Sequence, residues 1–396
     1  MSVLRWTIAA AALSLLASGS SFAQSSPPIY RGDQSRSQHV GLGKVLTTLD
    51  GGQIFGFDIN QKGNDGALAS AQTIDPEGDT LVSVETFNQN TGAITKSFAR
   101  HQGKRHEYSF DGIFANDIGL VTHYVTPPNS IFAIRYYDVM NPVTAQKFTG
   151  AWTPPIHDID VLQGVENQDS SKSVLFAIEL KNQDRPDLIV SDIAANTFGH
   201  IYHLDPNLFG GGNGPRLSEF SAANEAVIAL SPDGGRVGGA APLNVLIDLR
   251  TGKTTMLTGL NNGPFGAGYV NGLAVDPNTG IAATTTELNA QVEFYDLTKR
   301  TATAVQLPCS RPGDQGLSGA GIAVDPVHKL FLVSEPFYCN GQQGSAIVVY
   351  DEHGTLIETI TGFKFAIAEP AAVLNPSKRL GWAFGPSFSQ LQQFFY

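Results

Sequence analysis

The residues of this chain that could do chemistry are carboxylates, two histidines (His123 and His157) and one asparagine, which recur at matching places in the sequence. Asp111 and Asn271 each lie five residues before a polar turn residue, and a looser alignment adds His157. Glu287 and Glu335 each lie at the end of the second expected strand of their repeat. Converging carboxylate and amide oxygens suit Ca²⁺ or Mg²⁺, and added imidazoles would also suit Zn²⁺ or Mn²⁺. We therefore expect Asn271, Glu287 and Glu335 as metal ligands, with His157 and Asp111 as catalytic groups.

A repeated motif with a period of roughly 50 residues must position these side chains. Each copy is a short apolar strand, a turn containing proline and a second apolar strand. The clearest copies are 226–232 (AVIALSP), 271–277 (NGLAVDP) and 320–326 (AGIAVDP), with shorter ones at 73–76 and 371–376. The residues that precede the prolines at 232, 277, 326 and 376 are separated by 45, 49 and 50 positions. Degenerate copies at 111–116 and 157–162 bring the count to seven units.

Inside one unit the pattern indicates four strands, at 321–324, 330–334, 346–350 and 356–360, separated by turn residues. Such units at even spacing predict an all-β, seven-bladed β-propeller with four antiparallel strands per blade. Six or eight blades are alternatives, whereas a β-sandwich would not require the repeat. The last unit shows only three strands, so we expect 44–49 to supply its fourth, because two strand edges would otherwise stay exposed.

The repeat also predicts which residues lie at the mouth of the channel, where the first strand of each blade begins and the second ends. Besides the residues named above, it places Ser70, Ala226, Glu85 and Glu179 there. Strand ends at a solvent-exposed mouth are polar in any propeller. A role as ordinary solvated groups is therefore the alternative to a metal site for each of these side chains.

The 271–277 segment resembles the Asn-Gly-Leu-x-x-(Ser/Asp)-Pro signature of gluconolactonase/regucalcin-like propellers. The 231–234 turn (SPDG) is similar to that of YVTN-type and lactonase-type seven-bladed propellers. The resemblance implies a divalent-metal site with Asn271 as one ligand and Glu287 or Glu335 in the place of the family's Asp. It also implies hydrolysis of a lactone or ester, in which the metal polarises the carbonyl and activates water. A non-catalytic binding or interaction propeller is the alternative, because fold alone does not choose between them.

The N-terminus predicts export. Arg5, the apolar run 8–16 and the small-x-small pattern at 21–23 indicate a signal peptide over 1–23. We expect a disordered segment over 24–40 and a single propeller domain over 41–396, secreted or periplasmic. No later apolar run is long enough to span a membrane. The formal net charge of −11 argues against a nucleic-acid partner and leaves a small molecule, a glycan or a protein as the partner.

Cys309 and Cys339 are the two cysteines of the chain, and in an oxidising compartment such a pair is typically bridged. Cys309 precedes the predicted strand 321–324, and Cys339 follows the predicted strand 330–334. Because these two strands are antiparallel, both cysteines lie in loops at the same end of the blade.

We therefore predict a Cys309–Cys339 disulfide, which would close a loop of about 30 residues and stabilise the fold by roughly 3–4 kcal/mol. The intact mass of exported, unreduced protein should correspond to a chain that begins at Gln24 and takes up no alkylating reagent. Two readily alkylated thiols would contradict the disulfide, and a mass that includes residues 1–23 would contradict the cleavage.

Overall fold

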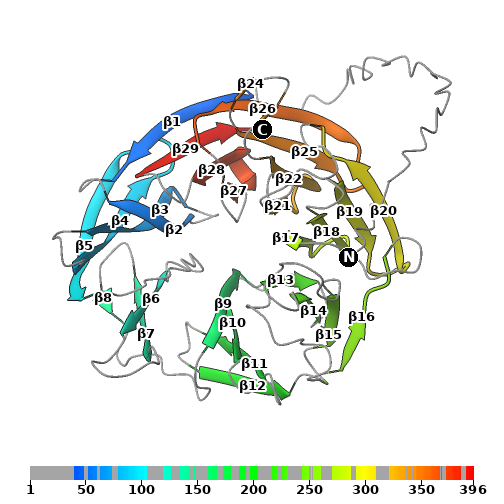
Figure 1. The fold of residues 1–396 in the computed structure, drawn as a ribbon, viewed down its shortest axis with the longest axis horizontal. Coiled ribbons are helices and arrows are strands. Elements are labelled where there is room, and N and C mark those ends of the chain that lie inside the picture. Colours follow the sequence, from blue (N-terminus) through cyan, green and yellow to red (C-terminus); the bar gives the residue numbers. More distant parts are fainter. Residues whose placement is uncertain are drawn as a thin grey trace, which may run out of the picture. The chain divides into compact units, whose positions relative to one another are not determined.

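Strands account for nearly all the regular structure in the computed structural model of this chain, and the one helical turn among the described residues is the 3₁₀ helix Pro376–Lys378 (Figure 1). The structure describes residues 40–48, 52–59, 63–73, 79–104, 119–125, 134–141, 146–147, 159–166, 173–179, 187–192, 197–203, 216–221, 225–230, 243–248, 251, 253–259, 270–286, 291–308, 321–335, 338–339, 342–343, 345–365, 367, 372–384 and 389–396. They belong to one compact unit, Ser37–Tyr396.

The strands of the first half form three antiparallel sheets in chain order, each named here by a Roman numeral. Sheet I contains β2 (Gln53–Ile59), β3 (Asp65–Thr73), β4 (Asp79–Asn88) and β5 (Ile94–Lys104). Sheet II contains β6 (Gly119–Val125), β7 (Ile134–Asn141) and β8 (Gln146–Lys147). Sheet III contains β9 (Ile159–Glu166), β10 (Ser173–Glu179), β11 (Asp187–Asp192) and β12 (Thr197–His203).

The second half continues in the same way with four sheets of four strands. Sheet IV contains β13 (Arg216–Ser221), β14 (Glu225–Leu230), β15 (Leu243–Asp248) and β16 (Thr254–Met256). Sheet V contains β17 (Val270–Asp276), β18 (Ile281–Thr286), β19 (Gln291–Asp296) and β20 (Thr301–Gln306). Sheet VI contains β21 (Gly321–Asp325), β22 (Leu330–Glu335), β25 (Ser345–Asp351) and β26 (Leu356–Phe363), with the hairpin β23 (Tyr338–Cys339) and β24 (Gln342–Gln343) inserted. Sheet VII contains β27 (Val373–Asn375), β28 (Leu380–Phe384), β29 (Gln390–Phe395) and β1 (Gly41–Thr47).

Consecutive sheets pack against each other through their apolar faces. The first strands β9, β13, β17, β21, β27 and β2 contact one another in that order. A core cluster joins sheets V and VI through Phe294, Phe331 and Tyr350, and similar clusters join sheets IV and V, VI and VII, and VII and I. Every residue of β22 is buried, because this strand has a neighbouring sheet on both faces. Strands in such a position become apolar throughout instead of alternating.

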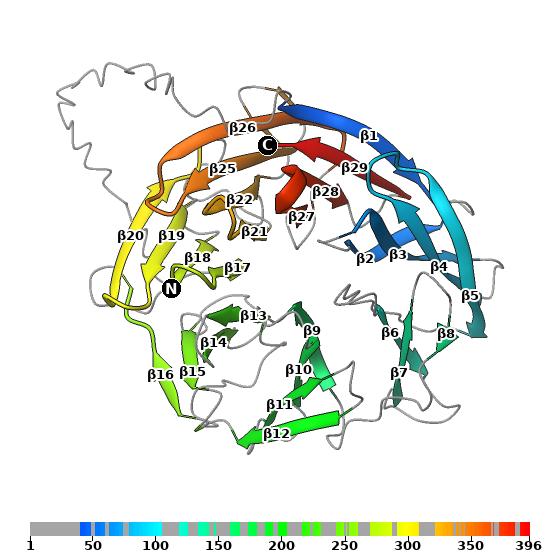
Figure 2. The same cartoon turned by 180° about the vertical axis from the view of Figure 1, so that it is seen from behind.

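The prediction that an N-terminal strand completes the last sheet is confirmed. β1 pairs antiparallel with β29, so that Leu46 lies opposite Leu391 (Figure 1; seen from behind in Figure 2). Leu46 is 1% exposed and packs with Leu391 and Trp382 in the cluster between sheets VII and I. The side chain of Gln393 accepts a hydrogen bond from the backbone N–H of Lys44 at 3.0 Å. Without β1, the edge of β29 would have no strand partner.

A buried amide network ties the completed sheet to sheet I. Asn375 Nδ2 donates to Gln89 Oε1 at 2.8 Å, and Gln393 Nε2 donates to the carbonyl oxygen of Gln89 at 2.7 Å. Gln89 Nε2 in turn donates to the carbonyl oxygen of Asp65 at 2.7 Å. These buried amide groups are hydrogen-bonded within the protein, as buried amides must be.

Two copies of the sequence motif lie one strand further along the sheet than predicted. The 226–232 copy begins in β14, the second strand of sheet IV, and the 73–76 copy follows β3 instead of β2. Ser70 therefore lies in a second strand opposite Ser83, and Glu85 lies within the third strand β4 opposite Leu68. Neither Ser70, Glu85 nor Ala226 occupies the predicted mouth position. The physical reason is that a polar residue followed by proline ends an apolar strand wherever that strand lies in the sheet.

Replacement of Leu46 tests the role of β1. We expect Leu46→Ala to lower the free energy of unfolding by about 3 kcal/mol, because it removes buried methyl groups and leaves a cavity beside Trp382. Val45→Ala is the matched control, since Val45 is an exposed neighbour on the same strand, and it should change stability by less than about 0.5 kcal/mol. Equal losses in urea unfolding of the two variants would contradict the role assigned to β1.

Candidate functional site

Asn271 lies in a β-bulge near the start of β17. Val270 pairs with Thr286 and Gly272 pairs with Thr285, which leaves Asn271 as the extra residue. The same irregularity occurs near the start of two other first strands, at Phe55 in β2 and at Asp160 in β9. Bulges are frequent beside active sites and at the rims of closed sheets. Asn271, the asparagine predicted as a metal ligand, therefore lies in an irregular part of its strand. It is at the end of the sheet where the sequence placed the channel mouth.

Glu335 lies where the sequence predicted, as the last residue of the second strand β22. Its side chain is 1% exposed, and the preceding Ser334 is fully buried. The pKa of the Tyr350 hydroxyl is raised well above its ordinary value, first by the burial of Tyr350 and second by the negative charge of Glu335. Glu335 is thus a buried acidic group at the predicted position, which makes it a candidate for a functional group.

The predicted metal site is not tested, because its other residues are not described or only their backbone is. His157, Asp111, Glu287 and Cys309 lie outside the described residues, and for Cys339 and Asn271 only the backbone is described. Cys339 lies in β23, directly after β22, as its predicted place in the loop requires. Within the part of the chain that the structure describes, no group of three His, Cys, Asp or Glu side chains could hold a metal ion. The metal site and the disulfide stay predictions.

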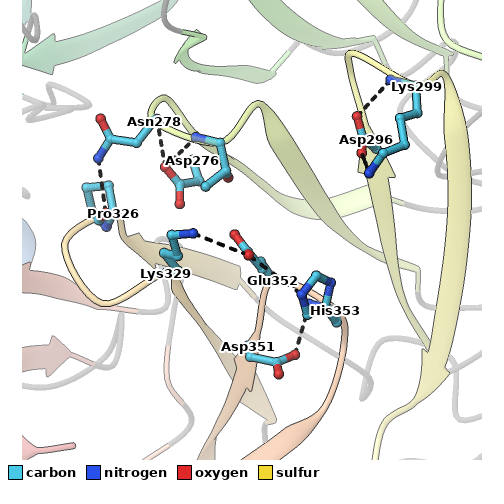
Figure 3. Close-up of polar contacts among 10 residues, drawn as sticks. Asp276, Asn278, Asp296, Lys299, Pro326, Lys329, Asp351, Glu352 and His353 are labelled. Atoms are coloured by element: carbon cyan, nitrogen blue, oxygen red, sulfur yellow. Dashed lines mark hydrogen bonds and ion pairs between the residues drawn. The ribbon is translucent and has the colours of Figure 1, made fainter. Parts of the chain in front are cut away.

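The opposite end of sheets V and VI carries a second polar cluster, which the sequence analysis missed (Figure 3). It consists of side chains from four hairpin turns and is called the turn cluster here: Asp276, Asn278, Asp296, Lys299, Pro326, Lys329, Asp351, Glu352 and His353. Asn278 Nδ2 donates to the carbonyl oxygen of Pro326 at 3.0 Å and so links the two sheets. Lys329 Nζ lies 3.4 Å from Glu352 Oε1 and links the two turns of sheet VI.

One local rule builds these turns. An aspartate ends the strand, and its Oδ1 accepts hydrogen bonds from the backbone N–H groups two and three residues later. The distances are 2.8 and 3.3 Å at Asp276, 2.9 and 2.8 Å at Asp296, and 2.9 and 3.0 Å at Asp325. Such bonds make aspartate a preferred turn residue. The chain then returns through a left-handed residue, which is Gly280, Arg300 or Lys329.

The turn cluster exposes its basic side chains and largely buries its carboxylates. Side-chain exposure is 77% for Lys299 and His353 and 55% for Lys329, against 15% for Asp296 and 19% for Glu352. Val327, on the turn beside Lys329, is 65% exposed. The signal in the sequence was the basic residues three or four positions after two of the strand-ending aspartates, Asp296 and Asp325, at 299, 300 and 329. This part of an acidic protein therefore presents lysine side chains and one apolar side chain to solvent.

Comparisons with known proteins establish the fold. No protein-family model matches the chain, and no curated protein matches it. The WD40 repeats of RRP9 are similar with a TM-score of 0.61 and 11% identity, over 90% of this chain and 98% of that chain. The structure of U3-55K is similar with a TM-score of 0.60 and 11% identity, again over 90% of this chain and 98% of that chain. Hydrazine synthase of Kuenenia stuttgartiensis is similar with a TM-score of 0.53 and 12% identity, over 93% of this chain and 99% of that chain. No helix of the described residues is long and apolar enough to cross a membrane. The chain is a β-propeller.

Proposed function

We propose that the chain is a secreted, seven-bladed, non-catalytic propeller that binds an acidic segment of a partner protein through the turn cluster. Seven blades accord with the seven sheets I–VII. The observation that carries the binding proposal is the separation of charge in the turn cluster. Lys299, Lys329 and His353 are exposed, while the carboxylates beneath them are largely buried.

Physical chemistry relates this separation of charge to binding. Exposed lysine side chains attract anionic groups of a partner even on a protein of net charge −11. Val327 adds an exposed apolar side chain that an interface can bury. Together these groups fit a peptide segment that carries carboxylates around an apolar residue.

The backbone supports the same interpretation. Arg300 in the β19–β20 turn and Lys329 in the β21–β22 turn have φ angles of 59° and 56°. The β17–β18 turn has Gly280 at the equivalent position, with a φ angle of 72°. A non-glycine residue in this conformation costs about 1 kcal/mol or more. Cationic side chains persist there against that cost, and strained residues in such places are often functional.

Charge reversal tests the proposal. We expect Lys299→Glu/Lys329→Glu to weaken the binding of poly-L-glutamate about tenfold or more, because two attractive contacts become repulsive. The control is Lys44→Glu/Lys253→Glu, which makes the same change in net charge at exposed lysines outside the turn cluster and should alter the affinity less than about twofold. Fluorescence anisotropy with labelled polymer measures both. Equal losses in the two variants, or no binding to the wild-type protein, would reject the turn cluster as the binding surface.

A metal-dependent lactonase-like hydrolase is the second candidate. The bulge at Asn271 and the buried carboxylate of Glu335 favour it, because both lie at the predicted end of their sheets. There Asn271, Glu287 and Glu335 would hold Ca²⁺ or Mg²⁺, or alternatively Zn²⁺ or Mn²⁺. His157 or Asp111 would take the proton from an attacking water. The bound ion would supply Lewis acidity.

Turnover of a panel of lactones and esters tests this second candidate. If it is right, Asn271→Ala and Glu335→Ala should each lower kcat/KM at least about 100-fold, since each removes a ligand of the metal. Glu179→Ala is the control and should retain activity. The hydrolase proposal fails if the purified protein turns over no member of the panel with any of the four cations added, or if the two variants match the wild-type protein.

A further inference from the structure

The second carboxylate oxygen distinguishes the turn of Asp276 from its counterparts. In the turn of Asp296, Oδ2 lies 2.8 Å from the ammonium group of Lys299, three residues later. In the turn of Asp325, Oδ2 lies 2.7 Å from Nδ1 of His328, again three residues later, and accepts a hydrogen bond from the Tyr396 hydroxyl at 3.0 Å. The residue three after Asp276 is Thr279. Oδ2 of Asp276 is buried and has no hydrogen-bond partner.

Two further oxygen atoms in the same region lack partners. Glu352 Oε2 and Thr279 Oγ1 are both buried and make no hydrogen bond. The Thr279 hydroxyl lies close enough to the Asp276 carboxyl to lower its pKa as a weak hydrogen-bond donor, although its geometry is too poor for a regular hydrogen bond, and the charge of Glu352 acts on the same carboxyl. The three groups are therefore close neighbours. Figure 3 shows the carboxylates of Asp276 and Glu352 facing the space near the Lys329 ammonium group. Lys329 approaches Oε1 of Glu352 at 3.4 Å, which leaves Oε2 without a donor.

This arrangement is costly for the protein alone. Asp276 is fully buried, and burial together with the charge of Glu352 raises its pKa above the ordinary value. Removing a carboxylate oxygen from water without a partner costs free energy, and a second carboxylate adds repulsion. At Asp296 and Asp325 the chain itself supplies the compensating donor. At Asp276 it supplies only the neutral hydroxyl of Thr279, which offsets less of the carboxylate charge than the Lys299 ammonium group does at Asp296. The hydroxyl oxygen can also serve as a neutral ligand of a cation.

We propose that Asp276 Oδ2, Glu352 Oε2 and Thr279 Oγ1 bind a hard cation, Ca²⁺ or Mg²⁺. Both ions take oxygen ligands and complete their coordination with water. The ion stands where Lys299 and His328 stand in the equivalent turns. The site is separate from the predicted mouth site, because Asn271 lies near the start of β17 and Asp276 at its end. A cation there would hold the β17–β18 turn of sheet V to the β25–β26 turn of sheet VI.

The test is a thermal melt of the full chain, treated with chelator and then given CaCl₂ or MgCl₂. We expect the cation to raise the Tm of the wild-type protein by about 2–4 °C, since an ion that binds only the folded state stabilises it. Thr279→Lys supplies the donor that the other turns have. It should melt above the wild-type protein without cation and no longer respond to the cation. Glu352→Gln should lose most of the response.

Two controls locate the effect. Asp296→Asn changes an equivalent turn whose Oδ2 has its own lysine, and its response to cation should equal that of the wild-type protein. Asn271→Ala/Glu335→Ala removes the predicted mouth ligands and should also keep the response. The proposal is overturned if neither cation shifts the wild-type melt, or if Thr279→Lys responds as the wild-type protein does. A response lost only in Asn271→Ala/Glu335→Ala would assign the cation to the mouth instead.

Discussion

Burial of apolar side chains between consecutive sheets is the interaction on which the rest of this structure depends. A single four-stranded sheet cannot cover both of its faces. Here Phe294, Phe331 and Tyr350 fill the space between sheets V and VI, and equivalent clusters fill the spaces from sheet IV through sheet VII to sheet I. Fully burying one such side chain stabilises the fold by about 1.5–3 kcal/mol. Each sheet therefore needs its neighbours, and sheet VII needs β1 as well.

The same packing leaves the polar chemistry to the ends of the strands. Because the faces of β22 are buried throughout, functional side chains can project only from strand ends and from the turns between strands. At one end lie Glu335 and the bulge at Asn271, and at the other lies the turn cluster. The aspartates that cap the turns also place Lys299 and Lys329 at the surface. A requirement of hairpin geometry thus brings lysine side chains to the surface of an acidic protein.

Much of the fold could be predicted from the sequence, because strand and turn signals are local. The four strands of sheet VI, the strand that β1 adds to sheet VII and the positions of Asn271 and Glu335 at strand ends were all predictable. The place of a strand within its sheet could not be predicted. The segments 73–76 and 226–232 contain the ends of second strands, yet they have the same polar residue and proline as the turns that follow first strands. Sequence spacing alone also could not show that Asp276 lacks the donor that Asp296 and Asp325 have. That difference depends on how Glu352, 76 residues later, packs against the turn.

Hydrogen exchange at backbone amides, measured with and without bound poly-L-glutamate, tests the central claim that the propeller binds through its turn cluster. The account predicts slower exchange in the turns at 277–280, 297–300, 326–329 and 352–355, with no change around Asn271 or Glu335. Protection confined to 270–272 and 333–335 would place the ligand at the other end of the sheets and contradict the account.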